Sequence, residues 1–370
     1  MTMERKNGID SILEAKLHHL TLPDSNENNI SAIEYFSVIS KLVKDYSPSI
    51  SLSISMHLYT IWGLQSLLSE DQKKYYFEKV RTENALFSSL NEPGLYFVQP
   101  KQVNEKEFPI VAKKIGDSYI VNGVKNFVSL EPYVRYLPVY ALIENHQGPG
   151  FGIVVLILDK QTHGIYIEKN WDTISMKSTH SNRVILKDVI VNQDQVVDIG
   201  ANIQKTELLG YLFRLSVSSV YYGVAQTALD YIVEQCKKKK VPHTNTKLAF
   251  FPGVQFSLSE IIILLETSYS QIRYLCDLLD QFLQNKHEYK SEQVNTSSLI
   301  TKEYVTNTAQ QIVNKAMKIE GIGSLFEENP LSILYTDVKA GAFHPPQRDI
   351  LYELLAKQKL GIIPFRNRWC

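Results

Sequence analysis

The chain has few cysteines and no surplus of charge of either sign. Its three cysteines, Cys236, Cys276 and Cys370, lie far apart and form no C-x-x-C motif. This spacing predicts neither a disulfide framework nor a zinc site, and it fits a reducing cytoplasm. Lys plus Arg and Asp plus Glu each total 39, so the formal net charge is zero. Because nucleic-acid binding needs a clustered basic surplus, we do not expect nucleic acid as the main partner.

Long apolar runs are also missing. No segment reaches the roughly 18 apolar residues needed to span a membrane, and the first residues are polar and charged, unlike a signal peptide. We therefore expect a cytoplasmic protein with no membrane partner. The chain has 370 residues, 44% of them hydrophobic and 21% charged. This composition is enough for a large core, in one extended domain or in two to three smaller ones.

Amphipathic helices are predicted up to about residue 80. Residues 30–43 and 52–68 carry apolar side chains at helical spacing. Ser69 precedes Glu70 and Asp71, and a hydroxyl followed by acidic residues is typical of an N-cap. The pattern therefore predicts a third helix over residues 70–80.

Between residues 86 and 197 the pattern changes to short runs typical of β-strands. Turn-forming residues separate the runs, among them Asn122-Gly123, residues 146–150 and Lys187-Asp188. Six or more such runs predict a compact antiparallel barrel or sandwich. The predicted strands cover residues 118–121, 134–142, 152–158, 164–167, 182–186 and 189–191.

Three long segments with apolar faces follow and predict helices over residues 208–235, 253–283 and 296–320. Long antiparallel helices of this kind form a bundle. The expected fold class is α+β with several domains. We expect an N-terminal helical domain (1–85), a middle β domain built as an antiparallel barrel or sandwich (86–200), and a C-terminal bundle of the four-helix type (201–370).

A stiff elbow is predicted near the end of the bundle. An amphipathic helix ends at Gly341, and a new helix begins at Ile350. Between them, Pro345-Pro346 fixes the backbone and removes two hydrogen-bond donors. Phe343 and His344 immediately precede the prolines, so the elbow is expected to line a pocket.

Five stretches, in this order, resemble motifs of the acyl-CoA dehydrogenases. They are S-E-D-Q-K at 69–73, L-N-E-P at 90–93, Y-I-V-N-G-V-K-N-F-V-S at 119–129, M-K-S-T with V-I-L-K-D-V-I-V at 176–191, and L-Y-T-D-V-K at 334–339. The resemblance covers most of the chain. It implies the acyl-CoA dehydrogenase-like fold, with FAD held between the β domain and the bundle. It also implies a homodimer or homotetramer, an acyl-CoA or related thioester substrate, and an electron-transferring flavoprotein or oxygen as electron acceptor.

On the flavin-ring side, the resemblance assigns Phe127, Ser129 and Asn91 to the cofactor. Phe127 stands where the family usually has Trp against the flavin, and Ser129 where a hydroxyl bonds the ring edge. Strand alternation puts Val128 on the opposite face from these two, although a core Phe127 and a turn-forming Ser129 remain the alternative. Asn91 stands where the family has Thr, and its alternative is an Asx-turn before Pro93.

Four further residues are assigned to the cofactor by position in the family pattern. Lys240 stands where an Arg usually meets the FAD pyrophosphate of a neighbouring subunit, although Lys acts only as a point charge. Gly321 resembles the glycine turn near the adenine, and its alternative is a helix C-cap. Pro346 and Gln347 stand where the family has the Gly-Thr after its catalytic glutamate.

The usual catalytic base is absent from both positions that the family uses. Counting from Asp337, the glutamate falls on Pro345, and Phe213 occupies the second position, before Arg214. His344 and Asp349 are the candidate substitutes, since a histidine titrates near neutral pH. For Asp349 the alternative is the N-cap of the last helix.

A second departure lies at residues 94–97, where Tyr96 and Phe97 replace small residues of the family pattern. The substrate side is therefore expected to be remodelled while the flavin side is partly kept. Glu207 and Glu260 are weaker base candidates that are typical of solvated helix positions.

Three functions remain open from the sequence. The first is an FAD-dependent dehydrogenase of acyl thioesters with a relocated or missing base. The second is a monooxygenase of the same fold that uses reduced flavin from a separate reductase, because such an enzyme needs no base for an α proton. The third is a non-catalytic flavin-binding or assembly protein. The sequence favours the dehydrogenase narrowly.

Overall fold

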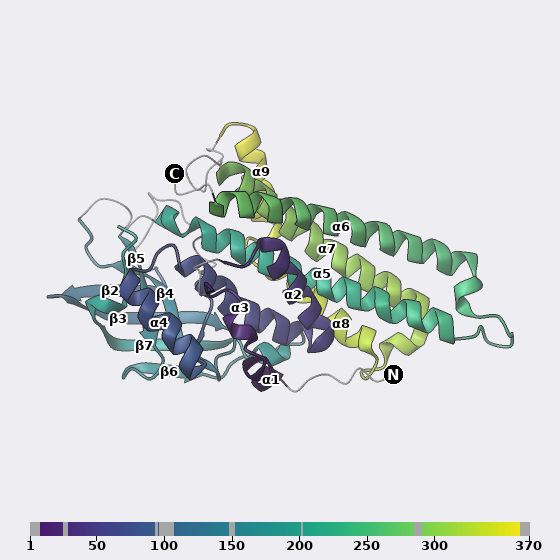
Figure 1. Cartoon of the computed structure of the whole chain (residues 1–370), viewed down its shortest axis with the longest axis horizontal. Helices are drawn as coiled ribbons and strands as arrows, with labels where there is room; N and C mark the ends of the chain where they lie inside the picture. Colours follow the sequence, from purple (N-terminus) through teal and green to yellow (C-terminus); the bar gives the residue numbers. More distant parts are fainter. Residues whose placement is uncertain are drawn as a thin grey trace.

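The computed structural model describes residues 8–24, 29–92, 95, 107–147, 152–200, 203–284 and 291–362. The β-sheet forms one end of the molecule and three long helices extend from it to the other end, as Figure 1 shows. The N-terminal helices lie along this junction. The predicted fold class, α+β with helices, a sheet and a helical bundle in this order, is confirmed.

The hydroxyl cap that the sequence predicts at Ser69 is present. Ser69 accepts a hydrogen bond from the backbone of Gln72, whose side chain accepts one from the Ser69 backbone, which satisfies two donors at the start of the helix. Ser31 and Glu34 make the same capping box. The elements are α1 (Gly8–Glu14), η1 (Leu17–His19), α2 (Ala32–Asp45), α3 (Pro48–Leu64) and α4 (Glu70–Glu83).

The eight described strands form a mixed sheet of order β6-β7-β3-β2-β4-β5-β8, with β1 paired to β4. Most pairs are antiparallel, but β2 and β1 both pair with β4 in parallel. The prediction of a wholly antiparallel sheet is therefore corrected. The chain passes from β3 to the far side of β2, so β4 runs in the direction of β2. The strands are β1 (Leu86–Phe87), β2 (Ile110–Ile115), β3 (Ser118–Val128), β4 (Val134–Ile143), β5 (Ile153–Asp159), β6 (Ile165–Glu168), β7 (Asn182–Val191) and β8 (Val196–Val197).

Two predicted turns lie inside strands. Asn122-Gly123 is part of β3, and Lys187-Asp188 is part of β7, where the two strands face each other across a register shift. The Asn122 side chain accepts a hydrogen bond from the Asp188 backbone (2.9 Å) and donates one to its carboxylate (3.0 Å). These bonds replace missing ladder bonds, so residues that usually form turns here form a paired bulge.

The C-terminal region is built around α5, which packs against α2, α3, α6 and α7. The three predicted long helices are present. The elements are η6 (Ile203–Thr206), α5 (Glu207–Lys238), η7 (Leu248–Phe250), α6 (Pro252–Gln284), α7 (Ser291–Glu320), η8 (Gly321–Leu325), α8 (Pro330–Val338), η9 (Lys339–Phe343) and α9 (Arg348–Lys359). Two short 3-10 turns, η4 (Lys177–Thr179) and η5 (Gln193–Gln195), belong to the sheet region.

One continuous apolar core joins the helical and β regions. The division at residues 85 and 200 therefore stays a prediction. Within the described ranges, no helix combines the length and the apolar character that crossing a membrane requires.

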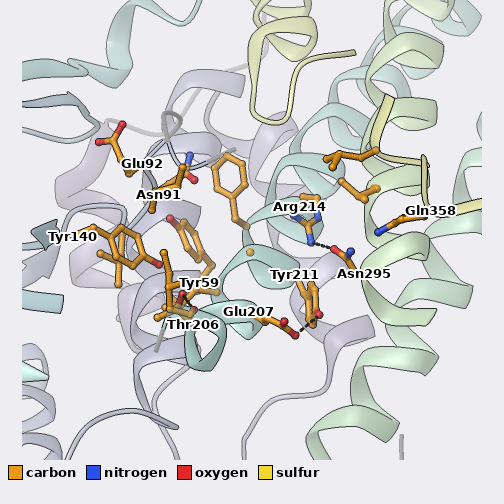
Figure 2. A pocket seen from close by; sticks show the side chains of 18 residues that line it. Tyr59, Asn91, Glu92, Tyr140, Thr206, Glu207, Tyr211, Arg214, Asn295 and Gln358 are labelled. Carbon is orange, nitrogen blue, oxygen red and sulfur yellow. Dashed lines mark hydrogen bonds between the residues drawn. The ribbon is translucent and has the colours of Figure 1, made fainter. Parts of the chain in front are cut away.

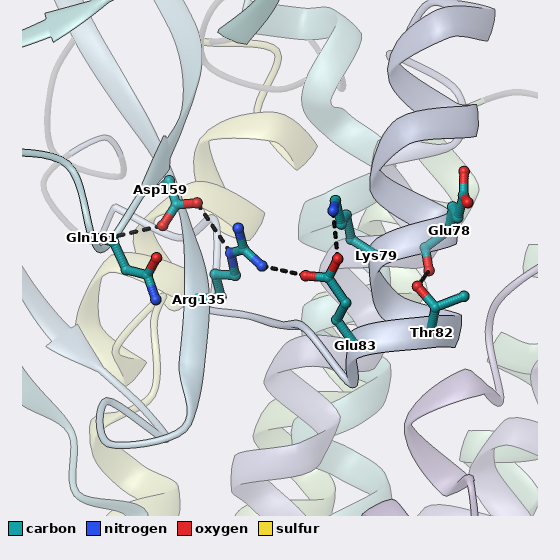
Figure 3. Close-up of polar contacts among 7 residues, drawn as sticks. All are labelled: Glu78, Lys79, Thr82, Glu83, Arg135, Asp159 and Gln161. Atoms are coloured by element: carbon teal, nitrogen blue, oxygen red, sulfur yellow. Dashed lines mark hydrogen bonds and ion pairs between the residues drawn. The ribbon is translucent and has the colours of Figure 1, made fainter.

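A polar network fixes α4 to the sheet. The Arg135 guanidinium donates to Asp159 (3.0 Å) on β5 and also to Glu83 at the end of α4, which in turn binds Lys79 (Figure 3). The Arg135 side chain is 29% exposed. Since each such partly solvated pair contributes at most about 1 kcal/mol, the network serves orientation more than stability.

Candidate functional site

The elbow is anchored to the sheet through Asp337 at the end of α8. The Asp337 carboxylate accepts a hydrogen bond from the Met176 backbone N–H (2.7 Å), and its carbonyl accepts one from the Ser175 hydroxyl (3.2 Å). A charged acceptor makes such a bond stronger than a neutral one. The elbow that follows α8 is therefore held at a fixed place beside the loop before η4.

The same loop continues into a chain of hydroxyls that ends at Ser129. Thr179 bonds Ser181 (2.8 Å), and Ser181 bonds Ser129 (2.9 Å). Thr179 also donates to the Met176 carbonyl (2.9 Å). Ser129, which the resemblance assigns to the edge of the flavin ring, is thus connected to the elbow through only a few hydrogen bonds.

Phe127 presents a bare aromatic ring beside this chain of hydroxyls. It is 58% exposed, whereas the next residue, Val128, is fully buried. Its φ of 58° lies in the left-handed region at a register shift between β3 and β7, which re-aims a side chain and is common beside functional sites. The Trp171 ring meets it edge-on, 6.3 Å between ring centres. Phe127 does not belong to the core of the described chain.

Asn91 and Glu92, which follow β1 in the chain, line a pocket. Lys125, the lysine of the N-G-x-K stretch, is 4% exposed, and its burial lowers its pKa to about 8 although the Glu92 carboxylate opposes this shift. Of residues 94–97, Gly94, Tyr96 and Phe97 lie outside the described residues, and Leu95 lines the pocket. The predicted remodelling at Tyr96 and Phe97 stays a prediction.

The pocket has a volume of about 120 Å³ and lies between the sheet region, the start of α5, α7 and α9. Figure 2 shows Asn91 and Glu92 on one side and Asn295 and Gln358 on the other, with Arg214 between them. Its polar and aromatic lining residues also include Tyr59, Tyr140, Thr206, Glu207, Tyr211 and Phe213.

Arg214 is the cation of this pocket and is 4% exposed. It donates to the Ser298 hydroxyl (2.8 Å) and to the Asn295 carbonyl oxygen (3.0 Å), both on α7. Within the described ranges, its Nη1 has no hydrogen-bond acceptor, and no carboxylate forms an ion pair with it. A buried guanidinium that keeps a donor free is suited to bind an acceptor on a substrate.

His344 lies in the elbow against α5 and is partly exposed. Its Nε2 is 3.0 Å from the Tyr221 hydroxyl, and its ring meets Phe213 edge-on, 6.3 Å between ring centres. Burial, with the nearby Lys302 ammonium, lowers the pKa of His344 to about 3. The imidazole is therefore neutral at physiological pH.

Lys302 is a fully buried cation on α7 that the sequence did not single out. Its ammonium donates to the Pro346 carbonyl (3.1 Å) and lies 4.0 Å from Glu303. Burial lowers its pKa to about 8, and the Arg214 charge acts in the same direction. Because α7 carries many polar residues, its buried ones could not be told from its exposed ones by spacing alone.

Asp349 and Gln347 lie on the outer side of the elbow and are both exposed. Gln347 occupies the N-cap of α9, and Asp349 lies in the first helical turn, where a carboxylate stabilises the helix dipole. Gln347 and Asp349 line a shallow hollow together with Phe343 and Tyr352. This hollow is separate from the pocket of Arg214. The arrangement gives more weight to His344 than to Asp349 as the substitute for the missing glutamate.

Lys240 and Gly321 lie together at the other end of the bundle. Lys239 forms an ion pair with Glu320. Because Lys240 follows Lys239 and Gly321 follows Glu320, Lys240 and Gly321 lie in the same region. Arg214 and Lys240 are separated by most of α5, about 40 Å at 1.5 Å per residue. Within one copy of the chain, Lys240 and Gly321 therefore do not lie near Phe127 and Ser129.

Comparison with known proteins agrees with this architecture. Residues 200–360 match the family model "Acyl-CoA dehydrogenase, C-terminal domain". The Bacillus subtilis (strain 168) protein named "Putative acyl-CoA dehydrogenase YdbM" is 29% identical over 95% of this chain and 88% of its own length.

Two solved structures show the same fold at lower identity. The FMN-bound dibenzothiophene monooxygenase TdsC from Paenibacillus sp. A11-2 has a TM-score of 0.84 at 17% identity, covering 98% of this chain and 92% of TdsC. Butyryl-CoA dehydrogenase from Megasphaera elsdenii has a TM-score of 0.80 at 18% identity, covering 95% of this chain and 89% of that enzyme.

Helices, a mixed sheet and a long bundle with a pocket at their junction define the acyl-CoA dehydrogenase type of architecture. The chain shares this fold, and its residues 200–360 match the family model of the acyl-CoA dehydrogenase C-terminal domain.

Proposed function

We propose that the chain is a flavin-dependent oxidoreductase whose cofactor ring lies against Phe127, between the sheet and the elbow. A flavin ring needs an apolar or aromatic wall and hydrogen-bonding groups at its edge. The exposed Phe127 ring supplies the wall, the Ser129 hydroxyl follows it two residues along the chain, and the Asn91 amide lines the pocket of Arg214. These residues fit the group, and when bound it would supply two-electron redox chemistry.

The phosphate side of the cofactor is proposed to come from a second copy of the chain. Lys240 and Gly321 are about 40 Å from the pocket along α5, so they serve a cofactor held by a neighbouring chain. Exposed apolar side chains gather at the same end of the bundle, and such a patch marks an interaction surface. They are Phe250, Phe256, Ile322, Leu325 and Phe326, each at least 60% exposed. A homodimer or homotetramer is therefore proposed, with FAD as the cofactor; a cytoplasmic location also stays a prediction.

Oxygenation by reduced flavin is the reaction that the geometry favours. The observation that carries it is the neutral His344 at the elbow, with Pro345 at the position of the family's glutamate. A base whose pKa is about 3 takes up a carbon-bound α proton poorly. A bound reduced flavin would supply two electrons for a reaction with O₂ in which one oxygen atom goes to the substrate and the other to water. Both electrons come from the flavin, so no substrate carbon has to lose a proton.

Within this reaction, the side chains of the chain bind and orient the substrate. The free Nη1 of Arg214 binds an acceptor atom, and Asn295 and Ser298 hold the guanidinium in place. The neutral imidazole of His344 can donate a hydrogen bond without carrying a charge. The pocket, at about 120 Å³, is below the roughly 300 Å³ of common ligand sites, which favours a small substrate or a narrow part of a larger one.

Dehydrogenation of an acyl thioester is the second candidate. It is favoured by the likeness to YdbM over 95% of the chain. In that reaction a base takes the α proton and the β hydride passes to the flavin, which leaves a carbon–carbon double bond. The electrons then pass to an electron-transferring flavoprotein or to oxygen. His344 and Asp349 stay the candidates for the base.

One set of experiments on the full chain separates the candidates. The purified protein is loaded with FAD or FMN and mixed anaerobically with acyl-CoAs of several chain lengths. Bleaching of the flavin on mixing supports dehydrogenation and contradicts our preference. In the second arm, photoreduced flavin, ¹⁸O₂ and the same thioesters or small thioethers are mixed. A product that carries one ¹⁸O atom is the expected result.

The third candidate, a non-catalytic role, has its own outcome. A protein that binds neither FAD nor FMN in a fluorescence titration would contradict both enzymatic proposals.

A further inference from the structure

The Tyr221 hydroxyl and the His344 imidazole form a partly buried pair that the family pattern does not assign. Tyr221 lies in the middle of α5 and is fully buried, and its oxygen is 3.0 Å from His344 Nε2. The two rings meet at 5.6 Å between centres with an interplanar angle of 60°. The contact joins residues 123 positions apart.

The pair is held from two further sides. Gly341, three residues before His344, lies so close to Tyr221 that a Cβ on it would be 3.0 Å from a ring carbon and 3.1 Å from Thr306 Cβ. On the other side, Lys302 donates to the Pro346 carbonyl (3.1 Å). The elbow is therefore clamped before and after His344, and the imidazole has little freedom to turn away from Tyr221.

The direction of the hydrogen bond follows from the needs of the phenol. Burial and the charge of Asp337 raise the pKa of Tyr221 well above its ordinary value, so the hydroxyl keeps its proton. Within the described part of the chain, His344 Nε2 is the only hydrogen-bond partner of that hydroxyl. If Nε2 carried a proton, the buried phenolic proton would lack an acceptor, which is unfavourable. The phenol therefore donates, and Nε2 accepts.

We propose that Tyr221 is a positioning residue that holds the neutral His344 in the tautomer with its proton on Nδ1, so that Nδ1–H is the donor offered to the site. Nδ1 has no protein partner among the residues that the structure describes. The charged and titratable groups around the pair are Lys302 on α7 and Asp337 on α8, with Arg214 behind Lys302. Lys302 disfavours a second proton on the ring. This inference deepens the proposed function, since it names what His344 offers to the substrate or cofactor.

The tautomer is measured directly by ¹⁵N NMR on the full chain with labelled histidine, without cofactor or substrate. His344→Gln identifies the signals of His344 by their disappearance. The expected result is a protonated Nδ1 and an unprotonated, hydrogen-bonded Nε2 in the unsubstituted protein from pH 6 to 8. A protonated Nε2, or a doubly protonated ring in that range, overturns the proposal whatever reaction the protein catalyses.

Tyr221→Phe tests the assignment to Tyr221, and Tyr222→Phe is the matched control. Tyr222 is the neighbouring residue, half-buried between Phe36 and Tyr269, and it has no contact with His344. Tyr221→Phe is expected to shift the Nε2 resonance and to populate the second tautomer, while Tyr222→Phe leaves both signals unchanged. Unchanged signals in a folded Tyr221→Phe protein overturn the role of Tyr221. If that variant does not fold, the tautomer of the unsubstituted protein still decides the proposal.

A kinetic readout separates positioning from a merely structural role. In the reaction that the loaded protein catalyses, Tyr221→Phe is expected to lower kcat about tenfold, the equivalent of one hydrogen bond of about 1.4 kcal/mol. KM and the melting temperature are expected to stay near those of Tyr222→Phe. An equal loss in both variants contradicts the positioning role.

Discussion

The two ends of α5 both carry cations, but their surroundings are opposite. At the first end, Arg214 is buried, as is its neighbour Lys302 on α7, and both are hydrogen-bonded to neutral groups. Just past the second end, Lys240 is exposed, and its ammonium donates a long hydrogen bond to Asn245 (3.5 Å). Among the described residues Arg214 has no carboxylate partner, and Lys302 has Glu303 only at 4.0 Å, so keeping these two cations buried is costly, whereas an exposed cation costs little. The difference is what the proposed function expects, with a bound group inside this chain at the first end and a group from a second copy at the second end.

Arg214→Leu is the strongest test of the difference between the two ends of α5. It removes the donor for Asn295 and Ser298 and leaves both polar groups buried, so a loss of about 2–3 kcal/mol in the free energy of unfolding is expected. Urea titration followed by circular dichroism measures it. Lys237→Leu at the exposed end is the control and should change stability by less than about 0.5 kcal/mol. Equal losses in the two variants would mean that burial does not distinguish the ends.

Lys240→Glu tests the second end through cofactor binding. It reverses a charge proposed to face the cofactor phosphates, so the Kd of FAD is expected to rise about tenfold or more, equivalent to about 1.4 kcal/mol. Riboflavin, which has no phosphate, is expected to bind both proteins equally. Fluorescence titration with each ligand gives the comparison, and Lys237→Glu is the matched control. A Kd for FAD that does not change removes Lys240 from the site.

The pH dependence of stability sharpens the contrast at the buried end. The pKa of Lys302 falls from 10.5 when unfolded to about 8 when folded, so between these values the unfolded chain binds more protons. Stability is therefore expected to rise with pH from about 8 towards 10, by up to about 1 kcal/mol per pH unit. Lys302→Met should lose part of this rise, whereas Lys237→Met should keep it. Identical slopes in both variants and the unsubstituted protein contradict the assignment.

The smallest effect is expected at the surface network of α4. Arg135→Met breaks the contacts with Glu83 and Asp159 that Figure 3 shows. Because the arginine is partly solvated, the loss is expected to be at most about 1 kcal/mol and to shrink in 0.5 M salt. Thermal melts at two salt concentrations measure it. A loss of more than about 2 kcal/mol in the free energy of unfolding that salt does not reduce would mean that this network behaves like the buried groups Arg214 and Lys302.

Local patterns in the sequence predicted most of the secondary structure. Ser69 is the cap that its hydroxyl and the following acidic residues predict, and the three long helices lie where apolar spacing put them. Two predicted turns were wrong because side chains replace backbone bonds there, and the parallel pairing of β4 and the strand β2 were not predicted. Asn122 and Asp188 have the composition of turns, but their mutual hydrogen bonds keep β3 and β7 continuous.

The candidate site was predictable only in part. Phe127, Ser129 and His344 were named from motif positions, and the structure places Phe127 bare at a bulge and His344 against α5. Lys302 and Tyr221 gave no signal, because a lysine in a polar helix and a tyrosine in an apolar one are both ordinary. Their importance comes from contacts with residues far away in the chain.

The sequence by itself determined the order of helices and strands, the likeness to the acyl-CoA dehydrogenases, and the presence of Pro345 in the elbow. These are properties of local spacing and of residue identity. Only the tertiary structure decided that Asp349 lies on the outer side of the elbow while His344 Nε2 lies 3.0 Å from the Tyr221 hydroxyl. A bond between residues 123 positions apart depends on how α5, α7 and the elbow pack together, and no local pattern encodes that packing.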